Sequence, residues 1–382
     1  MRPTLFSGRT DRNATEMDWE ALLGRPREQA SEALHSINAG KSILITGAGG
    51  SIGSALAMSI AQSNPRVLVL LDSSEQNLYR LDRELSSSSA NTPRVVIIGG
   101  VDDAALIDLL FTQHRPDTIY HAAAYKHVPL MESNPFAAVR NNALGTYRLA
   151  QSAVRHRVGH FLMVSTDKAV NPCSIMGASK RIAELALLSC SNPFTRMNSI
   201  RLGNVLGSQG SVVPLFLEQI SRSEALTVTH PEAERFFFTM DETIALILEA
   251  AAIPGQKQIL VPRFLKPIKT VELANYLLAQ SGEVPGNASI CFTGLRPGEK
   301  LREEFFSSIE HVAGNVGLRL CRVESIAVPE KTLQTAMAEL DHSIRRQGLE
   351  EMLQTVQRLV PEYQPSTLLA DNHAVQMVSV HG

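Results

Sequence analysis

Short apolar runs recur along the first half of the chain, and longer stretches with helical spacing of their apolar residues separate them. Runs of this kind, almost wholly apolar and only a few residues long, are typical of parallel strands buried on both faces of a sheet. They cover residues 42–46, 66–71, 94–98, 118–121, 160–165 and 199–202. Strands that alternate with helices in this way predict an α/β fold with a doubly wound parallel sheet.

Beyond Gly203 the alternation ends, and prolines and glycines interrupt the pattern repeatedly. This is typical of a smaller, mixed α/β lobe packed beside the sheet. We expect a helical N-terminal arm over 1–40, the parallel-sheet domain over 41–203, a substrate lobe over 204–320 from which 238–262 return to the sheet, and C-terminal helices with a loose tail over 321–382. Within these segments, residues 1 to about 15 and the tail from Pro365 are expected to be disordered, and 331–359 helical.

Charge and cysteine content narrow the class of protein. The chain has 382 residues, with 36 basic and 38 acidic side chains, so it lacks the excess of positive charge that nucleic-acid binding requires. Its four cysteines form no C-x-x-C pair, which argues against a metal site and against a disulfide framework. No apolar run approaches the roughly eighteen residues of a membrane span, and the N-terminus lacks a signal-peptide pattern. We therefore expect a cytoplasmic enzyme.

A glycine-rich turn follows the first apolar run and leads into a helix. Glycines stand at 47, 50 and 53, and Ser51 and Ile52 lie between the last two. Glycine permits the tight turn and the close approach of a pyrophosphate, which the helix N-terminus attracts. The second strand ends at Asp72, where a carboxylate can accept hydrogen bonds from an adenosine ribose. Together these features predict a Rossmann-type dinucleotide site.

A second polar segment follows the strand over 160–165. It begins with Thr166, Asp167 and Lys168 and continues to Lys180. Open α/β sheets bind their ligands at the carboxyl ends of the strands, so we expect the chemistry here. An Asp-Lys pair is often only a surface salt bridge, but the position of this pair directly after a buried strand favours a functional one.

Six motifs occur in order and carry a family resemblance. They are TGAGGSIGS from Thr46, HAAAYKHVPLME from His121, STDKAVNP from Ser165, RLGNVLGS from Arg201, THPE from Thr229 and TGLRPGEKL from Thr293. Together they resemble the extended short-chain dehydrogenase/reductase family, and within it the bacterial UDP-N-acetylglucosamine 4,6-dehydratases of polysaccharide biosynthesis, including the CapD-like proteins. The resemblance covers about residues 20 to 310. Since the large relatives carry membrane helices before this region, the chain resembles a stand-alone soluble form.

The resemblance implies a bound nicotinamide that is used and regenerated within each turnover. Hydride leaves C4 of the sugar, water is lost across C5 and C6, and the hydride returns to C6. By the resemblance, Asp167 and Lys168 are the acid/base pair of the elimination, and Thr166 hydrogen-bonds the sugar. It also implies that Ala122 and Ala123 line the cofactor and that Lys180 holds its ribose.

The chain departs from the broad family at the position of its usual catalytic tyrosine. Tyr-x-x-x-Lys is replaced by a motif with Met176 in place of the tyrosine and with Lys180 retained. Methionine cannot transfer a proton, so the base for the 4-hydroxyl must come from elsewhere, and Asp167 or Lys168 would act twice. The large dehydratases that the chain resembles share this methionine, which favours an active enzyme.

Residues for the nucleotide-sugar are expected mainly in the second lobe. Asn204 can bind the diphosphate or the N-acetyl group, and Ser211 to Val213 are expected to run extended beside the uracil. The remaining substrate residues are expected to be Arg235 and Arg296 for the diphosphate, Glu299 for ribose hydroxyls, and Lys126 and His127 near the sugar.

Cofactor choice can be predicted from the end of the second strand. Asp72 would repel a 2′-phosphate and has no arginine beside it, which favours NAD over NADP. Relatives usually carry Gly-Asp after the third strand, whereas this chain has Gly99-Gly100, so one adenine contact is missing.

Two other functions are compatible with the same fold. A UDP-sugar 4-epimerase shares the oxidation at C4 but needs no acid for the 6-hydroxyl, and a non-catalytic nicotinamide sensor would be consistent with Met176. The partners expected are a UDP-sugar, a second copy of the chain and a downstream sugar aminotransferase, with neither nucleic acid nor membrane among them.

Overall fold

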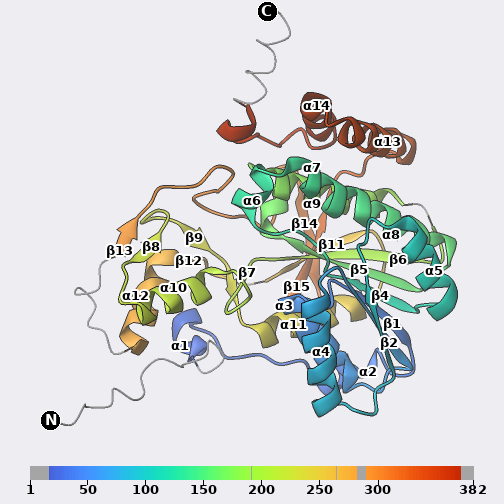
Figure 1. The fold of residues 1–382 in the computed structure, drawn as a ribbon, viewed down its shortest axis with the longest axis horizontal. Coiled ribbons are helices and arrows are strands. Elements are labelled where there is room, and N and C mark those ends of the chain that lie inside the picture. Colours follow the sequence, from blue (N-terminus) through green and yellow to red (C-terminus); the bar gives the residue numbers. More distant parts are fainter. Residues whose placement is uncertain (1–16, 191, 264, 282–289, 371–382) are drawn as a thin grey trace, which may run out of the picture.

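The centre of the molecule is a nine-stranded sheet (Figure 1). The computed structural model describes residues 17–190, 192–263, 265–281 and 290–370. Strand order is β14-β15-β11-β6-β5-β4-β1-β2-β3. The parallel strands are β1 (Ser42–Thr46), β2 (Val67–Asp72), β3 (Arg94–Ile98), β4 (Thr118–His121), β5 (His160–Thr166), β6 (Arg196–Leu202) and β11 (Gln258–Pro262). The predicted doubly wound parallel sheet is confirmed.

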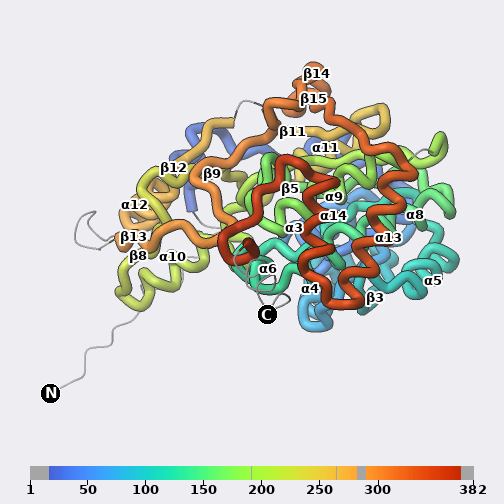
Figure 2. The backbone as a smooth tube through the Cα atoms, turned by 90° about the horizontal axis from the view of Figure 1, so that it is seen from above, coloured from blue at the N-terminus to red at the C-terminus, as the bar shows by residue number. Residues whose placement is uncertain are grey.

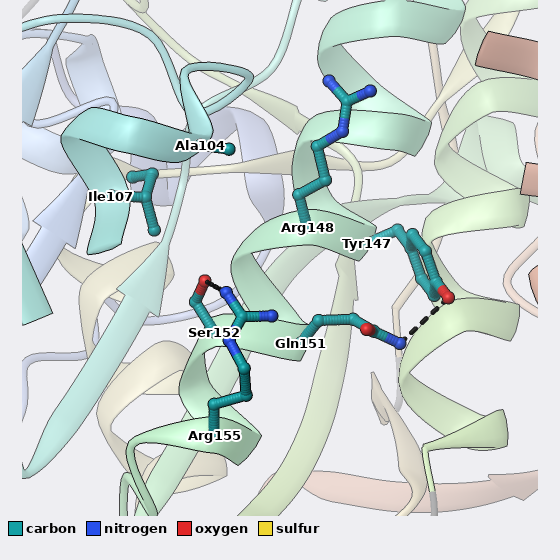
Figure 3. Close-up of a pocket in the computed structure, with 7 residues that line it drawn as sticks. All are labelled: Ala104, Ile107, Tyr147, Arg148, Gln151, Ser152 and Arg155. Carbon is teal, nitrogen blue, oxygen red and sulfur yellow. Dashed lines mark hydrogen bonds between the residues drawn. The ribbon is translucent and has the colours of Figure 1, made fainter. Parts of the chain in front are cut away.

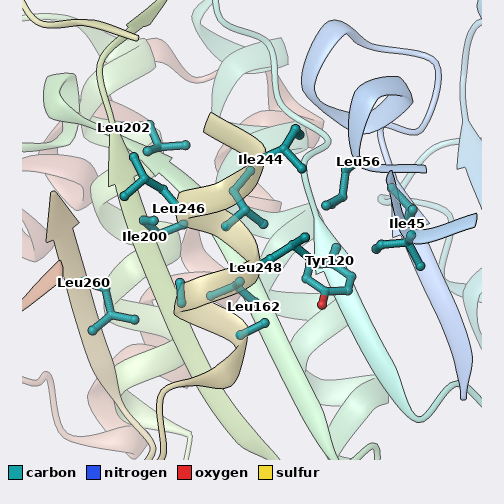
Figure 4. Close-up of a cluster of buried hydrophobic side chains, with 14 of the residues drawn as sticks. Ile45, Leu56, Tyr120, Leu162, Ile200, Leu202, Ile244, Leu246, Leu248 and Leu260 are labelled. Atoms are coloured by element: carbon teal, nitrogen blue, oxygen red, sulfur yellow. The ribbon is translucent and has the colours of Figure 1, made fainter. Parts of the chain in front are cut away.

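Helices cover both faces of this sheet. Against one face pack α3 (Ser51–Ala61), α4 (Glu75–Ser88) and α11 (Met240–Ala252), as the buried side chains in Figure 4 show for α3 and α11. Against the other pack α5 (Ala104–His114), α8 (Thr146–Arg155) and α9 (Ile175–Ser189). Because both faces are covered, the strands can be apolar throughout, which explains why they were recognisable in the sequence.

Two antiparallel strands complete the sheet at one edge. β15 (Leu320–Glu324) pairs with β11, and β14 (His311–Val316) pairs with β15. Residue 320, the expected boundary between substrate lobe and C-terminal segment, is the first residue of β15. This hairpin was not expected from the sequence, since β14 is largely exposed and lacks the apolar pattern of the central strands.

The smaller lobe lies at the carboxyl end of β6. Its helices are α10 (Val212–Ser221) and α12 (Thr270–Ser281), and its short strands are β7 (Asn204–Val205), β8 (Leu226–Val228), β9 (Glu234–Arg235), β10 (Phe237–Phe238), β12 (Ile268–Lys269) and β13 (Ile290–Phe292). The expectation that Ser211 to Val213 are extended is wrong for the two valines, which begin α10 after Ser211. Val213 and Phe216 fill the core of the lobe, and this packing outweighs the strand preference of valine.

The N-terminal arm contacts both parts of the molecule. It forms α1 (Trp19–Leu23) and α2 (Glu32–Ser36), so the prediction of helical pieces is confirmed. Side chains of α1 pack on the smaller lobe, and those of α2 pack on the core around α3 and α11. Between them, Arg25 hydrogen-bonds Glu242 of α11.

The C-terminal helices cover the outer side of α9. They are α13 (Glu330–Arg346) and α14 (Leu349–Leu359), so the predicted helical character of 331–359 is confirmed, and Figures 1 and 2 show them side by side above α9. They share a core with α9, with α6 (Val128–Glu132) and α7 (Pro135–Ala138), and with the π-helical η2 (Val139–Gly145).

The expectation of a loose tail from Pro365 is wrong for the part that the structure describes. Ser366 donates a hydrogen bond to Glu132, and Leu369 is buried. The expected disorder at 1–15 and the remainder of the tail lie outside the described residues. Among the residues that the structure describes, no helix has the length and apolar character to cross a bilayer.

A buried group of charges joins three parts of the chain. Arg201 on β6 is fully buried and forms paired hydrogen bonds of 2.8 to 2.9 Å with Glu184 of α9 and of 2.8 Å with Glu310. Arg181 adds a contact of 3.0 Å to Glu184. Burial alone would raise the pKa of Glu184, but Arg201 and Arg181 outweigh it and lower that pKa to about 2.

Replacing Glu184 by glutamine should therefore destabilise the protein strongly. The change leaves Arg201 buried and only partly paired, which costs about 3–5 kcal/mol of unfolding free energy. Urea denaturation measures the loss. Glu218→Gln removes an exposed pair with Arg222 and serves as the control, with a change below about 1 kcal/mol. Equal losses in the two variants would contradict the importance of the buried group.

Candidate active site

The glycine turn between β1 and α3 is closed too tightly for side chains. A Cβ at Gly53 would lie 2.0 Å from the carbonyl oxygen of Gly47, and a Cβ at Gly47, whose φ is +67°, would lie 2.6 Å from the nitrogen of Ala123. Gly50 is the N-cap of α3. The turn thus brings the N-terminus of α3 next to Ala122 and Ala123, the residues that follow β4.

Asp72 fixes this turn from the end of β2. One carboxylate oxygen accepts a hydrogen bond of 2.9 Å from the nitrogen of Gly49, and the other accepts one of 2.8 Å from the nitrogen of Ser74. Ser51 accepts a hydrogen bond from the nitrogen of Gln209 at 3.0 Å, while Ile52 is half-buried. Glycines that admit no Cβ, a helix N-terminus whose N-cap, Gly50, has no side-chain capping hydrogen bond within the described residues, and a carboxylate at the end of the next strand fit a dinucleotide.

His121 supports the turn from β4 as a neutral residue. The Thr146 hydroxyl donates its hydrogen bond to the carbonyl oxygen of Asn142, so it accepts a hydrogen bond of 2.7 Å from Nε2 of His121. The bare Nδ1 then accepts from Thr46 at 2.7 Å. Burial keeps the pKa of His121 well below its usual value. The ring therefore holds β1 and α8 in place and is not a proton donor for catalysis.

The predicted catalytic segment turns directly after β5. Thr166 ends the strand, and Asp167 and Lys168 begin the short 3-10 helix η3 (Asp167–Ala169). Oδ1 of Asp167 accepts hydrogen bonds of 3.0 Å from the Thr166 hydroxyl and from Nζ of Lys168. Its Oδ2 is buried and has no hydrogen bond within the described residues. One oxygen of this fully buried carboxylate is thus left without a hydrogen-bond donor among the described residues.

The polar neighbours of Lys168 come from three segments of the chain. Besides Asp167, Nζ contacts Oδ1 of Asn204 at 3.2 Å and lies 3.7 Å from Oε1 of Glu303. Burial alone would lower the pKa of Lys168, but the two carboxylates outweigh burial and raise it. The pKa of Asp167 is raised, chiefly by burial. Lys168 lowers this pKa and Glu303 raises it, but neither outweighs burial. The cluster favours a charged lysine beside a carboxyl group of increased basicity.

Lys180 and Met176 lie on the first turns of α9 and are both buried. Nζ of Lys180 donates to the carbonyl oxygen of Val164 at 2.8 Å, and burial lowers the pKa of Lys180 to about 8. Met176 belongs to the apolar core shared with the C-terminal helices. The methionine thus fills the core next to the lysine that by resemblance holds the cofactor.

The predicted substrate residues are only partly brought together. Asn204 lies in the cluster, whereas Arg235 donates to the backbone carbonyls of Glu234, Lys300 and Leu301. Arg296 and Glu299 form an ion pair of 2.6 Å with each other.

Lys126 and His127 are exposed and precede α6. Desolvation lowers the pKa of both, and the ring of His127 lies against Gly210.

Sequence reasoning missed Glu303 and Lys300. Lys300 stands within the RPGEK motif and Glu303 three residues after it, so their nearness to that motif was the available signal. Lys300 donates to the carbonyl oxygen of Val170 at 2.5 Å and lies 3.6 Å from Glu303. The loop carrying the motif therefore packs directly against the predicted catalytic segment.

A cavity of about 160 Å³ lies elsewhere, between α5 and α8 (Figure 3). Its walls are formed by Ala104, Ile107, Tyr147, Arg148, Gln151, Ser152 and Arg155, none of them a predicted site residue. Within the described residues no cluster of His, Cys, Asp and Glu could hold a metal ion.

Comparison with known sequences agrees with the geometry. A family described as "Polysaccharide biosynthesis protein" matches residues 43–323. The capsular polysaccharide biosynthesis protein CapD of Staphylococcus aureus is 44% identical over 78% of this chain and 50% of its own length, and the probable polysaccharide biosynthesis protein EpsC of Bacillus subtilis is 39% identical over 80% and 52%. The chain thus spans about half the length of these two relatives. A UDP-glucose 4-epimerase of Rickettsia akari is 32% identical over 70% of this chain and 78% of its own.

Solved structures show the same fold. Pen from Bacillus thuringiensis superposes with a TM-score of 0.67 at 27% identity, covering 79% of this chain and 98% of its own. The dTDP-glucose 4,6-dehydratase DesIV from Streptomyces venezuelae, solved with NAD bound, superposes with a TM-score of 0.61 at 23% identity over 69% and 87%. On the match over residues 43–323 and the identity to these relatives, the chain belongs to the polysaccharide biosynthesis protein family, which is of the short-chain dehydrogenase/reductase type.

Proposed function

We propose that the protein is an NAD-dependent 4,6-dehydratase of a UDP-N-acetylhexosamine, with UDP-N-acetylglucosamine as the preferred substrate. The observation that carries the proposal is the buried Asp167–Lys168 pair, in which the carboxylate keeps one free oxygen and the lysine lies between two carboxylates. A base beside an acid is what an elimination of water requires.

The glycine turn and Asp72 would hold the dinucleotide. Gly47, Gly50 and Gly53 admit the pyrophosphate at the N-terminus of α3, and the carboxylate of Asp72 disfavours a 2′-phosphate, so NAD is preferred. The bound nicotinamide supplies the acceptor and donor of hydride. Lys180 would hydrogen-bond its ribose from α9.

Asp167 is the base for the 4-hydroxyl in this proposal. Its free Oδ2 takes the hydroxyl proton while Thr166 and Lys168 hold Oδ1, which fixes the carboxylate in place. Lys168 is unsuited to this step because its neighbours keep it protonated. Asp167 thus takes the place of the tyrosine base that Met176 replaces in this chain.

Elimination then uses the same pair. The 4-ketone acidifies the proton on C5, and Lys168 gives a proton to the departing 6-hydroxyl. Before it acts at C5, Asp167 releases to solvent the proton that it took from the 4-hydroxyl. Asp167 then takes the C5 proton as the 6-hydroxyl departs, Lys168 is reprotonated from solvent, and Asp167 returns a solvent-exchanged proton to C5 after hydride reaches C6, so that the balance is loss of one water.

Substrate binding would come from the loops around this cluster. Asn204, Lys126 and His127 would contact the sugar, and Arg235 and Arg296 the diphosphate. Arg296 must exchange its partner Glu299 for the diphosphate, which frees Glu299 for ribose hydroxyls. The name of the Rickettsia relative, a UDP-glucose 4-epimerase, supports a UDP-sugar. The 4-keto product suits an aminotransferase in the cytoplasm, and we propose that the enzyme is a homo-oligomer.

That relative also makes a 4-epimerase the second candidate. An epimerase returns hydride to C4, and therefore has no use for an acid at the 6-hydroxyl. The position of Lys168 between Asp167 and Glu303 favours the dehydratase. A sensor that only binds nicotinamide would leave this costly buried cluster without a role.

Asp167→Asn and Lys168→Met should each abolish dehydration while NAD binding is retained. General acid-base groups contribute about 10²–10⁴-fold in rate, so losses of this size are expected. Mass spectrometry of the UDP-sugar after incubation follows the loss of one water. Glu232→Gln, which breaks the exposed pair with Lys269, should keep full activity. Turnover that persists in either site variant would show that the roles are wrongly assigned.

Gly53→Ala should weaken NAD binding at least about tenfold, because its Cβ would meet the Gly47 carbonyl at 2.0 Å and displace the turn. Calorimetric titration with NAD measures the change. Gly348→Ala is the matched control, since its Cβ would meet only the movable end of the Glu351 side chain. An unchanged affinity in Gly53→Ala would place the dinucleotide elsewhere.

A further inference from the structure

Glu303 is buried in the catalytic cluster although the mechanism above gives it no step. Its side chain is 3% exposed, and it reaches the cluster from the segment that follows the RPGEK loop. Oε1 lies 3.7 Å from Nζ of Lys168, and Oε2 lies 3.6 Å from Nζ of Lys300. Oε2 is buried and, within the described residues, makes no hydrogen bond.

The contacts of Lys168 define one position for its ammonium group. Asp167 lies on one side at 3.0 Å, Asn204 contributes an amide oxygen at 3.2 Å, and Glu303 lies at 3.7 Å. An ammonium has three protons to donate, and these oxygens come from three separate segments of the chain. Removing one oxygen would allow the flexible lysine side chain to adopt other positions.

The arrangement is costly for folding, which indicates a functional reason for it. Asp167 is fully buried and Glu303 nearly so, and each keeps one buried oxygen without a hydrogen bond. Two carboxylates close together in a buried site oppose each other's charge. A cluster of this kind at the end of a central strand is typical of sites where protonation matters for chemistry.

We propose that Glu303 is a positioning residue of the reaction, which holds the Lys168 ammonium beside Asp167 and keeps it charged until the 6-hydroxyl departs. This inference rests on the proposed dehydratase function. Glu303 touches neither the sugar nor the cofactor in this account, and acts only through its neighbours.

The charged groups around Lys168 and Glu303 determine how Glu303 changes the pKa values of Lys168 and Asp167. Lys168 is faced by Asp167, by Glu303 and by Arg235 of β9. Glu303 is faced in addition by Lys300, and it acts on Cys173 of the catalytic segment. Burial alone would raise the pKa of Glu303, but Lys168, Lys300 and Arg235 outweigh it and lower that pKa, so the carboxylate stays charged. Its charge raises the pKa of both Lys168 and Asp167.

Glu303→Gln should therefore move both limbs of the pH profile of kcat in the same direction. Loss of the negative charge makes Asp167 less basic and Lys168 more acidic, so each limb shifts toward lower pH by about one unit. Glu303→Asp, which keeps the charge, should restore most of the profile. Glu232→Gln again serves as the control and should move neither limb. A fall in activity at every pH with both limbs in place would overturn the proposal, because it would show a purely structural role.

A second measurement does not depend on turnover. Lysines labelled by ¹³C-methylation are titrated by NMR, and the Lys168 signal is assigned from its absence in Lys168→Arg. In the wild type Lys168 should titrate above the ordinary value of about 10.4, and in Glu303→Gln about one unit lower than in the wild type. A wild-type titration at or below the ordinary value would overturn the proposal even if the variant fails to fold.

The two measurements separate this proposal from the proposed function. If no dehydration occurs but the Lys168 titration moves as expected, the function is wrong and the role of Glu303 in holding Lys168 stands. If dehydration occurs and neither the titration nor the limbs move, the function stands and the role of Glu303 is wrong.

Discussion

The structure depends on one buried arginine, Arg201, held between Glu184 and Glu310. These residues belong to β6, to α9 and to the segment before β14, and leaving any one of them unpaired in the interior would cost several kcal/mol. Arg201 also donates to the carbonyl oxygen of Phe305 at 2.7 Å, and Glu184 accepts from Ser165 at 2.7 Å. The segment after the RPGEK loop is thereby fixed against the end of β5.

This constraint explains how the cluster of Asp167, Lys168 and Glu303 is assembled. Phe305 lies two residues after Glu303, and Ser165 directly precedes Thr166. Both sides of the cluster are therefore anchored on the same ion-pair group, which allows Asp167 and Glu303 to stay close to Lys168 despite their burial and the repulsion between the two carboxylates. In the proposed mechanism one group acts as a base and its neighbour 3.0 Å away as a charged acid, and it is their environment that allows this.

Much of the fold could be predicted because its signals are local. The apolar runs matched the parallel strands closely, and the glycine turn and the Thr166–Lys168 segment are found at the strand ends where they were expected. Their roles, and the division into a cofactor domain and a substrate lobe, stay predictions. What could not be predicted depends on contacts between distant segments. Val212 and Val213 favour a strand by propensity but form a helix on the core of the lobe.

The predicted site shows the same limit. Glu303 is distant in sequence from Lys168, and its nearness follows from the Arg201 group, which no local pattern reveals. Arg235 matches a diphosphate ligand in chemical type, yet in the structure it holds the backbone carbonyls of the RPGEK segment.

The most direct test of the account follows the sugar by proton NMR during incubation of the protein with UDP-N-acetylglucosamine and NAD in deuterated buffer. The account predicts a new 6-deoxy methyl signal and deuterium at C5, because Asp167 returns a solvent-exchanged proton to that carbon. A sugar epimerised at C4 with its 6-hydroxyl intact would contradict it.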